Sequence, residues 1–419
     1  MNSGNNSNRL SVIFLFMISL IISNNLDGQT WLRTMDRLPD TGQKINYTNS
    51  PGEDSDYEIN TPYYVDNGDG TVTDTITGLM WQKQDGGEMS YDSAVDWVGR
   101  LALAGYQDWR LPGIHESFSL MNLDALNPAL NKFAFTDTGA EYWWSADVAV
   151  NNPSKVWVTN SGGGQGAHPK TETISAGGTK KFHARAVRNT HPPNTLQARF
   201  KFIADSVVLD LLTGLMWERY PLNDSINWEN ALMRAENIVL GGYCDWRLPN
   251  IKEIESIQDE KNISPAVNKN FFSAIRSAKY WSSTSQFNRG VNAWYIDYQN
   301  LGLTTYGAKN TRACYAICVR TAEDQLLGVQ NNTMTHSGTM IYPNPAGQAL
   351  HLRGFSAGLY DIVLLNAVGE VLQRSSVQIT EENADYLFCV DHIAPGYYLM
   401  QVMMSGHLVK TQIIVVTGQ

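Results

Sequence analysis

Apolar residues recur at helical spacing in two distant segments of the chain. Between residues 90 and 103 they fall on one helical face, at Ala94, Val95, Val98 and Leu101. The second segment repeats the spacing at Ala231, Leu232, Ala235, Ile238 and Val239. Because residues three and four apart share a helix face, each segment is predicted to be a helix. Another helix is predicted to begin at Asn250, where Asn250-x-x-Glu253 has the form of a capping box.

Alternation of apolar and polar residues predicts the strands. Residues 64–76 alternate around Asn67-Gly68-Asp69-Gly70, which is typical of a β-hairpin. Five alternating segments follow Met340, at residues 349–352, 360–366, 371–379, 397–404 and 408–416. Short strands between turn residues favour a small all-β, Ig-like sandwich for residues 340–419.

The longest apolar run, residues 10–22, is too short to cross a bilayer comfortably. It follows a polar start with Arg9, as the apolar region of a secretory signal does. Residues 1–28 are therefore predicted to be a signal peptide, cleaved before Gln29. A retained N-terminal anchor is the alternative. No integral membrane span is expected after cleavage.

Two short segments of sequence occur twice, in the same order. Thr-Gly-Leu-Met-Trp occupies residues 77–81 and 213–217, and Asp-Trp-Arg-Leu-Pro occupies 108–112 and 245–249. Tyr142-Trp143 is paired with Tyr280-Trp281, and Trp157 with Trp294. We therefore predict one domain present twice. The paired tryptophans are predicted to be core residues, namely Trp81, Trp109, Trp143, Trp157, Trp217, Trp246, Trp281 and Trp294.

Helices early and strands late in each copy predict an α+β fold. The first repeat, with an N-terminal arm, is expected at residues 29–190 and the second at 200–321. A polar linker at 322–339 precedes the β-sandwich. Arg110 and Arg247, in the Asp-Trp-Arg-Leu-Pro segments, are expected to form structural ion pairs or to bond to backbone carbonyls, with an anion-binding role as the alternative.

Composition narrows the functional classes. Hydrophobic residues make up 43% and charged residues 17%, as in a globular protein. The net charge of −10 disfavours nucleic acid or an anionic membrane as partner. One basic run is interpreted as a solvated loop, with Lys170, Lys180, Lys181, His183, Arg185 and Arg188.

Cys244 and Cys318 occur only in the second copy, where the first copy has Gln107 and Ala186. Their joint presence predicts a disulfide, with two unrelated small core residues as the alternative. Cys314 lies four residues before Cys318, but no His or Cys pair follows to complete a zinc site.

The acidic residues of the predicted hairpin, Asp66, Asp69 and Asp74, raise the question of calcium. An EF-hand loop would need an acidic residue where Val65 stands. A plain turn is favoured over a metal site, and no cofactor is expected.

The Tyr-Val-Asp-Asn-Gly-Asp-Gly-Thr-Val-Thr-Asp segment, followed by Thr-Gly-Leu-Met-Trp and Asp-Trp-Arg-Leu-Pro, resembles the family named after the C-terminal domain of the Legionella collagen-like protein. This resemblance covers residues 35–189 and 200–321. It implies a fold like those of C-type lectins and sulfatase-modifying factors. The family prototype is a surface adhesin that binds sulfated glycans.

The C-terminal segment resembles the type A sorting domain of the type IX secretion system. The resemblance rests on Tyr342-Pro343-Asn344-Pro345-Ala346, Gly369-Glu370-Val371 and Ala394-Pro395-Gly396-Tyr397-Tyr398. It implies the type IX machinery as a partner. It also implies passage across the outer membrane, followed by release or surface attachment.

No enzyme signature is recognised, such as Gly-x-Ser-x-Gly or His-Glu-x-x-His. We predict a non-catalytic, adhesin-like protein that binds a glycan or matrix ligand. A structural surface protein making protein contacts is the alternative, and an unrecognised enzyme is a weaker third reading. The ligand surface is expected on the late loops, residues 144–183 and 282–310, because loops on a rigid scaffold carry binding residues. The candidate ligand residues are Trp144, Tyr295, Tyr298 and Tyr306.

Overall fold

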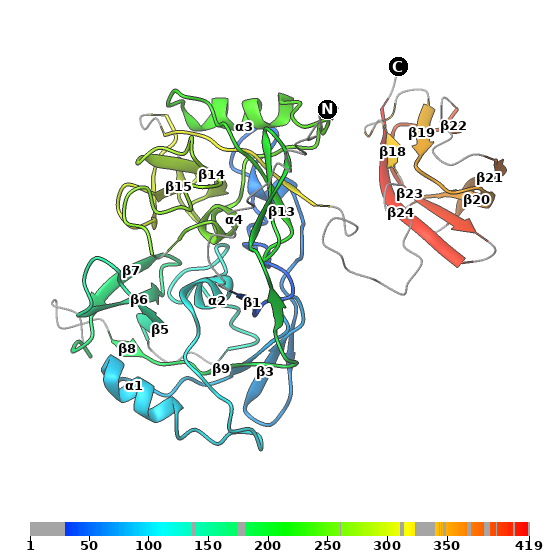
Figure 1. The fold of residues 1–419 in the computed structure, drawn as a ribbon. Coiled ribbons are helices and arrows are strands. Elements are labelled where there is room, and N and C mark those ends of the chain that lie inside the picture. Colours follow the sequence, from blue (N-terminus) through cyan, green and yellow to red (C-terminus); the bar gives the residue numbers. More distant parts are fainter. Residues whose placement is uncertain are drawn as a thin grey trace, which may run out of the picture.

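The computed structural model describes residues 30–135, 140–173, 181–259, 261–310, 314–322 and, with short gaps, 340–417. The predicted signal peptide and almost all of the predicted linker lie outside these residues. Two repeats lie against each other, and the C-terminal segment forms a β unit of its own (Figure 1). None of the described helices has the length and apolarity to span a membrane.

The first repeat combines two four-stranded sheets with two short helices, α1 (Tyr91–Val98) and α2 (Ile114–Ser119). One sheet has the order β2-β3-β4-β9, with strands Tyr64–Asp66, Thr71–Asp74, Leu79–Gln82 and Val187–Asn189. The other has the order β7-β6-β5-β8, with β5, β6, β7 and β8 at Tyr142–Val148, Lys155–Asn160, Gln165–Pro169 and Phe182–His183. Neighbouring strands are antiparallel except the pair β5 and β8.

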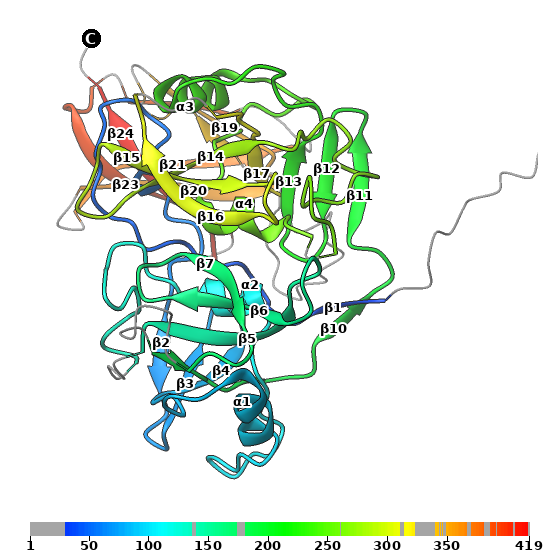
Figure 2. The same ribbon diagram turned by 90° about the vertical axis from the view of Figure 1, so that its left-hand side faces the viewer.

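The second repeat follows the same order of elements (Figure 2). Its helices are α3 (Trp228–Asn237) and α4 (Ile251–Ser256). One sheet, ordered β11-β12-β13-β17, has strands Phe200–Ala204, Val207–Asp210, Leu215–Glu218 and Val319–Thr321. The other, ordered β14-β15-β16, has strands Lys279–Ser285, Asn292–Asp297 and Leu303–Ala308. The architecture is therefore duplicated along with the sequence.

Each Thr-Gly-Leu-Met-Trp segment closes a hairpin. Asp74 accepts hydrogen bonds from the next backbone amides, including Thr77 N at 3.3 Å, and Gly78 N donates to Asp74 O at 2.9 Å. In the second repeat Gly214 N donates to Asp210 O in the same way. The two glycines have φ of 69° and 73°, a region that disfavours other residues. The repeated segment is thus a turn followed by a core strand.

The prediction of an α+β fold like that of C-type lectins and sulfatase-modifying factors is wrong. Strands in seven sheets make up about 40% of the structure and helices about 10%. The first predicted helix ends at Val98, and Ala104 and Gly105, with φ of 55° and 80°, turn the chain back. The late halves, expected to hold short strands and loops, instead contain sheets with strands of up to seven residues. The structure is therefore mostly β.

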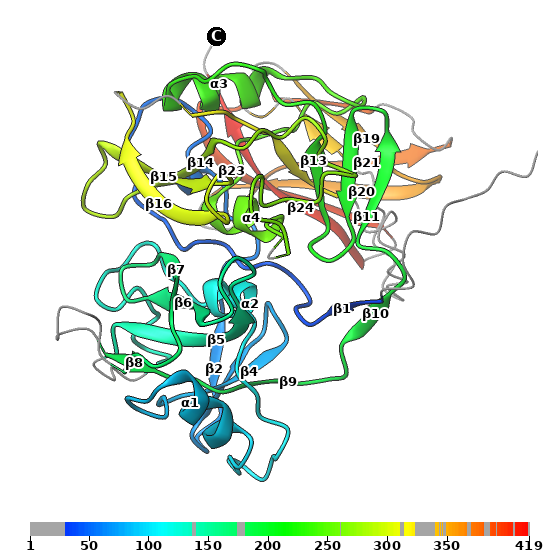
Figure 3. The same ribbon diagram turned by 60° about the vertical axis from the view of Figure 1, so that its left-hand side comes forward.

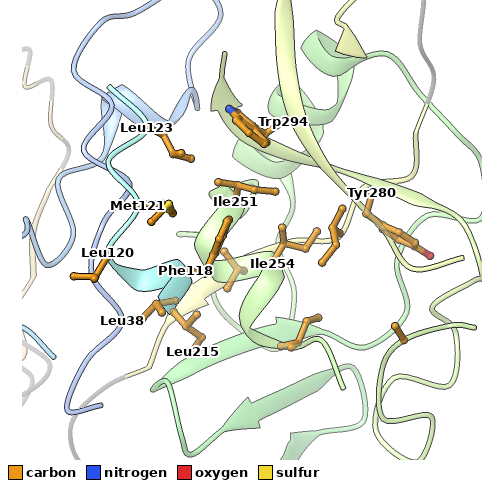
Figure 4. Packing of buried hydrophobic residues seen from close by; sticks show 14 of the residues in the cluster. Leu38, Phe118, Leu120, Met121, Leu123, Leu215, Ile251, Ile254, Tyr280 and Trp294 are labelled. Carbon is orange, nitrogen blue, oxygen red and sulfur yellow. The ribbon is translucent and has the colours of Figure 1, made fainter. Parts of the chain in front are cut away.

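The two repeats share one hydrophobic core. Helices α2 and α4 lie side by side where the repeats meet (Figure 3). Phe118 and Met121 from the first repeat belong to the same buried cluster as Ile251 and Ile254 from the second (Figure 4). Burial of apolar surface is the main stabilising term in folding, so each repeat depends on the other.

The segment before the first repeat crosses to the second. Strand β1 (Trp31–Arg33) pairs antiparallel with β10 (Asn194–Leu196), which lies between the repeats. Residues 38–57, which we call the arm, then pack on the second repeat and include a short 3-10 turn at Asp54–Asp56. The expectation that the arm simply leads into the first repeat missed this crossing.

The C-terminal unit contains two antiparallel sheets, and the Ig-like sandwich prediction fits it. The sheet β18-β19-β22 has strands Met340–Tyr342, Ala349–Arg353 and Tyr386–Cys389. The sheet β21-β20-β23-β24 has β20, β21, β23 and β24 at Gly358–Leu365, Val371–Ile379, Gly396–Met404 and His407–Val416. The unit has its own buried cluster, with Tyr360, Phe388 and Ile414 at its centre.

Candidate ligand-binding site

The Asp-Trp-Arg-Leu-Pro segments act as structural clamps. Arg110 forms two hydrogen bonds with Glu116, at 2.6 and 2.7 Å, and Glu116 also accepts one from Gly113 N at the start of α2. Arg247 and Glu253 repeat this arrangement at the start of α4. Burial alone would raise the pKa of Glu116, but the hydrogen bonds and charge of Arg110 hold it below its usual value. The ion pairs expected for both arginines are confirmed.

All eight paired tryptophans are buried, with at most 5% exposed, as predicted. The predicted pairing of Trp143 with Trp281 is wrong by one residue. Trp144 Nε1 donates to Met89 O and Trp281 Nε1 to Ile226 O, each at 2.9 Å. Trp144 is therefore the structural counterpart of Trp281, and Trp143 is the counterpart of Tyr280. The prediction had matched the two Tyr-Trp dipeptides, which are displaced by one residue relative to each other in the fold.

Three of the four predicted ligand residues lie in the core. Trp144 is fully buried and stacks on Phe182 with ring centroids 4.8 Å apart. Tyr295 is 4% exposed, and Tyr298 is fully buried with its hydroxyl donating to Ile254 O at 2.6 Å. These three rings offer no face to a ligand in this structure. Successive residues of a strand point to opposite faces of the sheet. An aromatic residue that lacks a counterpart in the other copy can therefore point into the core as readily as toward solvent.

The prediction of a Cys244–Cys318 disulfide is wrong, since neither cysteine forms a disulfide in this structure. Cys318 is buried, and its sulfur accepts a hydrogen bond from Arg234 at 2.8 Å. Cys244 is exposed. Burial raises the pKa of the Cys318 thiol well above its usual value, with Glu218 adding to the shift. The alternative of two unrelated small core residues therefore fits Cys318 but not the exposed Cys244.

The acidic hairpin residues have separate partners. Asp66 pairs with Lys83 at 2.5 Å, Asp69 accepts a hydrogen bond from Thr71, and Asp74 is buried in its turn. No group of three metal-ligand side chains gathers within the described residues. The three carboxylates therefore serve the hairpin.

The basic run is not simply a solvated loop. Arg185 is buried and donates to the carbonyls of Gln82 and Lys83. His183 pairs with Asp85 at 2.9 Å. Arg185 and His183 of the basic run are therefore paired inside the first repeat, and the run does not form one continuous basic surface.

A hollow of about 430 Å³ lies where the late loops of the two repeats meet. We call it the late-loop groove. Its lining comes from both predicted loop ranges and the nearby 126–127 turn: Leu126, Asn127, Asn160, Gly162, Gly164, Gln286, Phe287, Asn288, Arg289, Trp294, Thr304, Thr305 and Tyr306. Sequence patterns indicated each loop separately, but carried no signal that the two loops would face each other.

Glycines open this groove. Gly163 and Gly164 lie close to the Trp294 ring. A Cβ added to Gly163 would lie 3.8 Å from one ring atom, and one added to Gly164 would lie 3.7 Å from another. Trp157 of the first repeat is instead covered by Leu301 of the second repeat and by the partly buried Leu303. Leucine side chains thus seal one tryptophan, whereas the glycine loop leaves space beside the other.

The groove presents a mixed aromatic and polar surface. Tyr306 is 40% exposed and packs edge-on against Trp294, with ring centroids 5.4 Å apart. Asn160 holds the glycine loop by accepting from Gly162 N and Gly164 N. Arg289 is exposed, with no side-chain hydrogen bond or ion pair to the described residues. An aromatic face beside amides, hydroxyls and a single cation can bind a polar ligand that has an apolar face.

Comparison with protein families agrees with the duplicated architecture. The Lcl C-terminal domain model matches residues 70–188 and 206–320, together more than half of the chain. The chain therefore belongs to the Lcl C-terminal domain family. The Secretion system C-terminal sorting domain model matches residues 340–416. No curated protein matches the chain.

The sorting domain establishes the route of export. It directs the protein through type IX secretion to the cell surface or the extracellular space. The type IX machinery is therefore a partner. Together the domains define a secreted surface protein.

Proposed function

We propose that this protein is a non-catalytic surface binding protein and that the late-loop groove binds a short glycan. The observation that carries the proposal is the exposed face of Tyr306 beside amide and hydroxyl side chains, where loops of both repeats converge. Sugar rings have an apolar face that packs on aromatic rings and hydroxyls that pair with such polar groups. The volume of about 430 Å³ is in the ordinary range for a small-ligand site.

The charge of the groove narrows the glycan class. Arg289 is the one charged residue among the lining residues. Binding of a heavily sulfated glycan depends on clustered basic residues, and this lining has none. We therefore propose a neutral glycan, or one with a single acidic group placed near Arg289.

The test is a glycan array probed with the full chain, followed by affinity measurements on the strongest neutral hits. Tyr306→Ala is expected to weaken binding at least tenfold, about 1.4 kcal/mol. Gly164→Leu should fill the hollow and reduce binding further. Tyr220→Ala is the matched control, because Tyr220 is also exposed, at 46%, but does not line the groove. Array binding that Tyr306→Ala and Gly164→Leu both leave unchanged would contradict the proposed site.

A further inference from the structure

A groove in the second repeat is filled by a segment of the same chain. Helix α3, the start of α4 and the end of β14 form this second-repeat groove, and the arm lies in it. Thr284 Oγ1 donates to the arm residue Asp54. Glu53 of the arm is fully buried and faces Lys309 Nζ at 3.9 Å. The second-repeat groove thus holds an acidic segment of the same chain.

The first repeat contains the same groove framework, formed by α1, the start of α2 and the end of β5. We call it the first-repeat groove. Asp147 accepts a hydrogen bond from Ile114 N at the start of α2, at 2.6 Å. Thr284 accepts one from Ile251 N at the start of α4, at 3.0 Å. Asp147 and Thr284 therefore occupy equivalent places.

A lysine lies over an aromatic ring at the rim of each groove. Lys309 Nζ is 3.6 Å from the ring centre of Trp228, the first residue of α3. Lys170 Nζ is 5.5 Å from the ring centre of Tyr91, the first residue of α1. Lys309 faces Glu53 of the arm, whereas Lys170 forms no ion pair with the described residues.

The first-repeat groove is open where its counterpart is covered. Val95 is 43% exposed, while the corresponding Leu232 is fully buried. The Arg110 side chain is 37% exposed against 5% for Arg247. A mainly apolar cleft of about 620 Å³ results, with residues 32–35 among its lining.

We propose that the first-repeat groove binds an acidic peptide segment of a partner protein, in the manner in which the second-repeat groove binds the arm. The segment would place a carboxylate at Lys170 and an apolar side chain over Val95. It would place an uncharged polar residue at Asp147, because a second carboxylate there meets like charge. Extended peptides are commonly bound in grooves that combine such pockets with backbone contacts.

The experiment uses synthetic peptides of residues 38–57, with fluorescence polarisation against the full chain. The intramolecular arm already fills the second-repeat groove, so the added peptide is expected at the open one. Asp54→Asn in the peptide removes the carboxylate that would face Asp147. This peptide is expected to bind at least tenfold more tightly than the native sequence.

Variants of the protein locate the site. Val95→Arg should abolish binding of the Asp54→Asn peptide, and Ser93→Arg, on the exposed face of α1 away from the cleft, should leave it intact. Lys170→Glu should weaken binding at least tenfold, and a peptide that also carries Glu53→Lys should recover it. No saturable binding of either the native or the Asp54→Asn peptide would overturn the proposal. Binding that survives Val95→Arg would overturn it as well, since the peptide would then have displaced the arm.

Discussion

Replacing Arg247 with methionine is expected to destabilise the repeats far more than the same change at Arg110. Both arginines hold a glutamate that begins a helix, so the chain provides a matched control. The Arg247 and Glu253 side chains are 5% and 6% exposed, whereas Arg110 is 37% exposed beside Glu116 at 6%. The difference in water access decides the cost of leaving the glutamate unpaired.

The magnitude follows from this burial. Removing one partner of a buried ion pair typically costs about 3–5 kcal/mol, because the other charge remains without compensation. We expect that loss for Arg247→Met. For Arg110→Met we expect about 1–2 kcal/mol, because water can approach the vacated side of Glu116. The double variant Arg247→Met/Glu253→Gln should recover about 2 kcal/mol, because glutamine is neutral and can still accept from Asn250 N.

Urea unfolding followed by tryptophan fluorescence measures these losses. All 12 tryptophans lie between Trp31 and Trp294, so the signal reports on the repeats and not on the sorting domain. Because the repeats share a core, both variants should shift a single transition. A loss for Arg247→Met no larger than that for Arg110→Met would refute the argument. So would a double variant as unstable as the single one.

Four further outcomes follow from the fold. A fragment ending at residue 198 is expected to be unfolded or aggregated, because Phe118 and Met121 lose their partners; a cooperative urea transition of the fragment would contradict this. Burial raises the pKa of Asp40 to about 6 in the folded protein, so stability should fall as pH rises from about 4 to 6. Asp40→Asn should lessen this fall, because the buried Asp54 still contributes to it, and should gain up to about 3 kcal/mol at pH 7, measured by urea unfolding at both pH values. Trp144→Ala should lower stability by about 3–5 kcal/mol, whereas Tyr306→Ala should leave stability within about 0.5 kcal/mol. Deleting residues 340–419 should retain the protein inside the cell, and its appearance in the medium by immunoblot would argue against type IX export.

The sequence predicted the features that both copies repeat locally. Both Asp-Trp-Arg-Leu-Pro segments indicated an ion pair for their arginine, although the partners, Glu116 and Glu253, were not named. Repetition also identified the buried tryptophans. These predictions succeeded because each depends on residues near one another in the chain, or on a comparison that duplication supplies.

Contacts between residues far apart in the chain could not be predicted from the sequence. Tyr298 and Trp144 are buried by sheets whose pairing the residues alone did not define. The arm gave no local sign that Glu53 would lie beneath Lys309, because 256 positions of chain separate the two and no periodic pattern links them. Likewise the glycine loop was visible, but its contact with Trp294 depends on how the repeats pack together.

The duplication explains where open surface arises in this molecule. At two places, a hollow that is filled on one side of the duplication is open on the other. Leu301 covers Trp157, whereas Gly164 leaves space beside Trp294. The arm lies against α3, whereas Val95 on α1 stays exposed. Each hollow therefore occurs in two versions, one closed and one open, on the same framework of helices and strands. The closed version shows what fits the framework: leucine side chains in one case, an acidic peptide segment in the other. The residues that differ between the copies, such as Asp147 in place of Thr284, then determine the ligand chemistry of the open version. Asp147→Thr should therefore let the first-repeat groove bind the native arm peptide as tightly as the Asp54→Asn peptide, because threonine occupies this place in the second repeat.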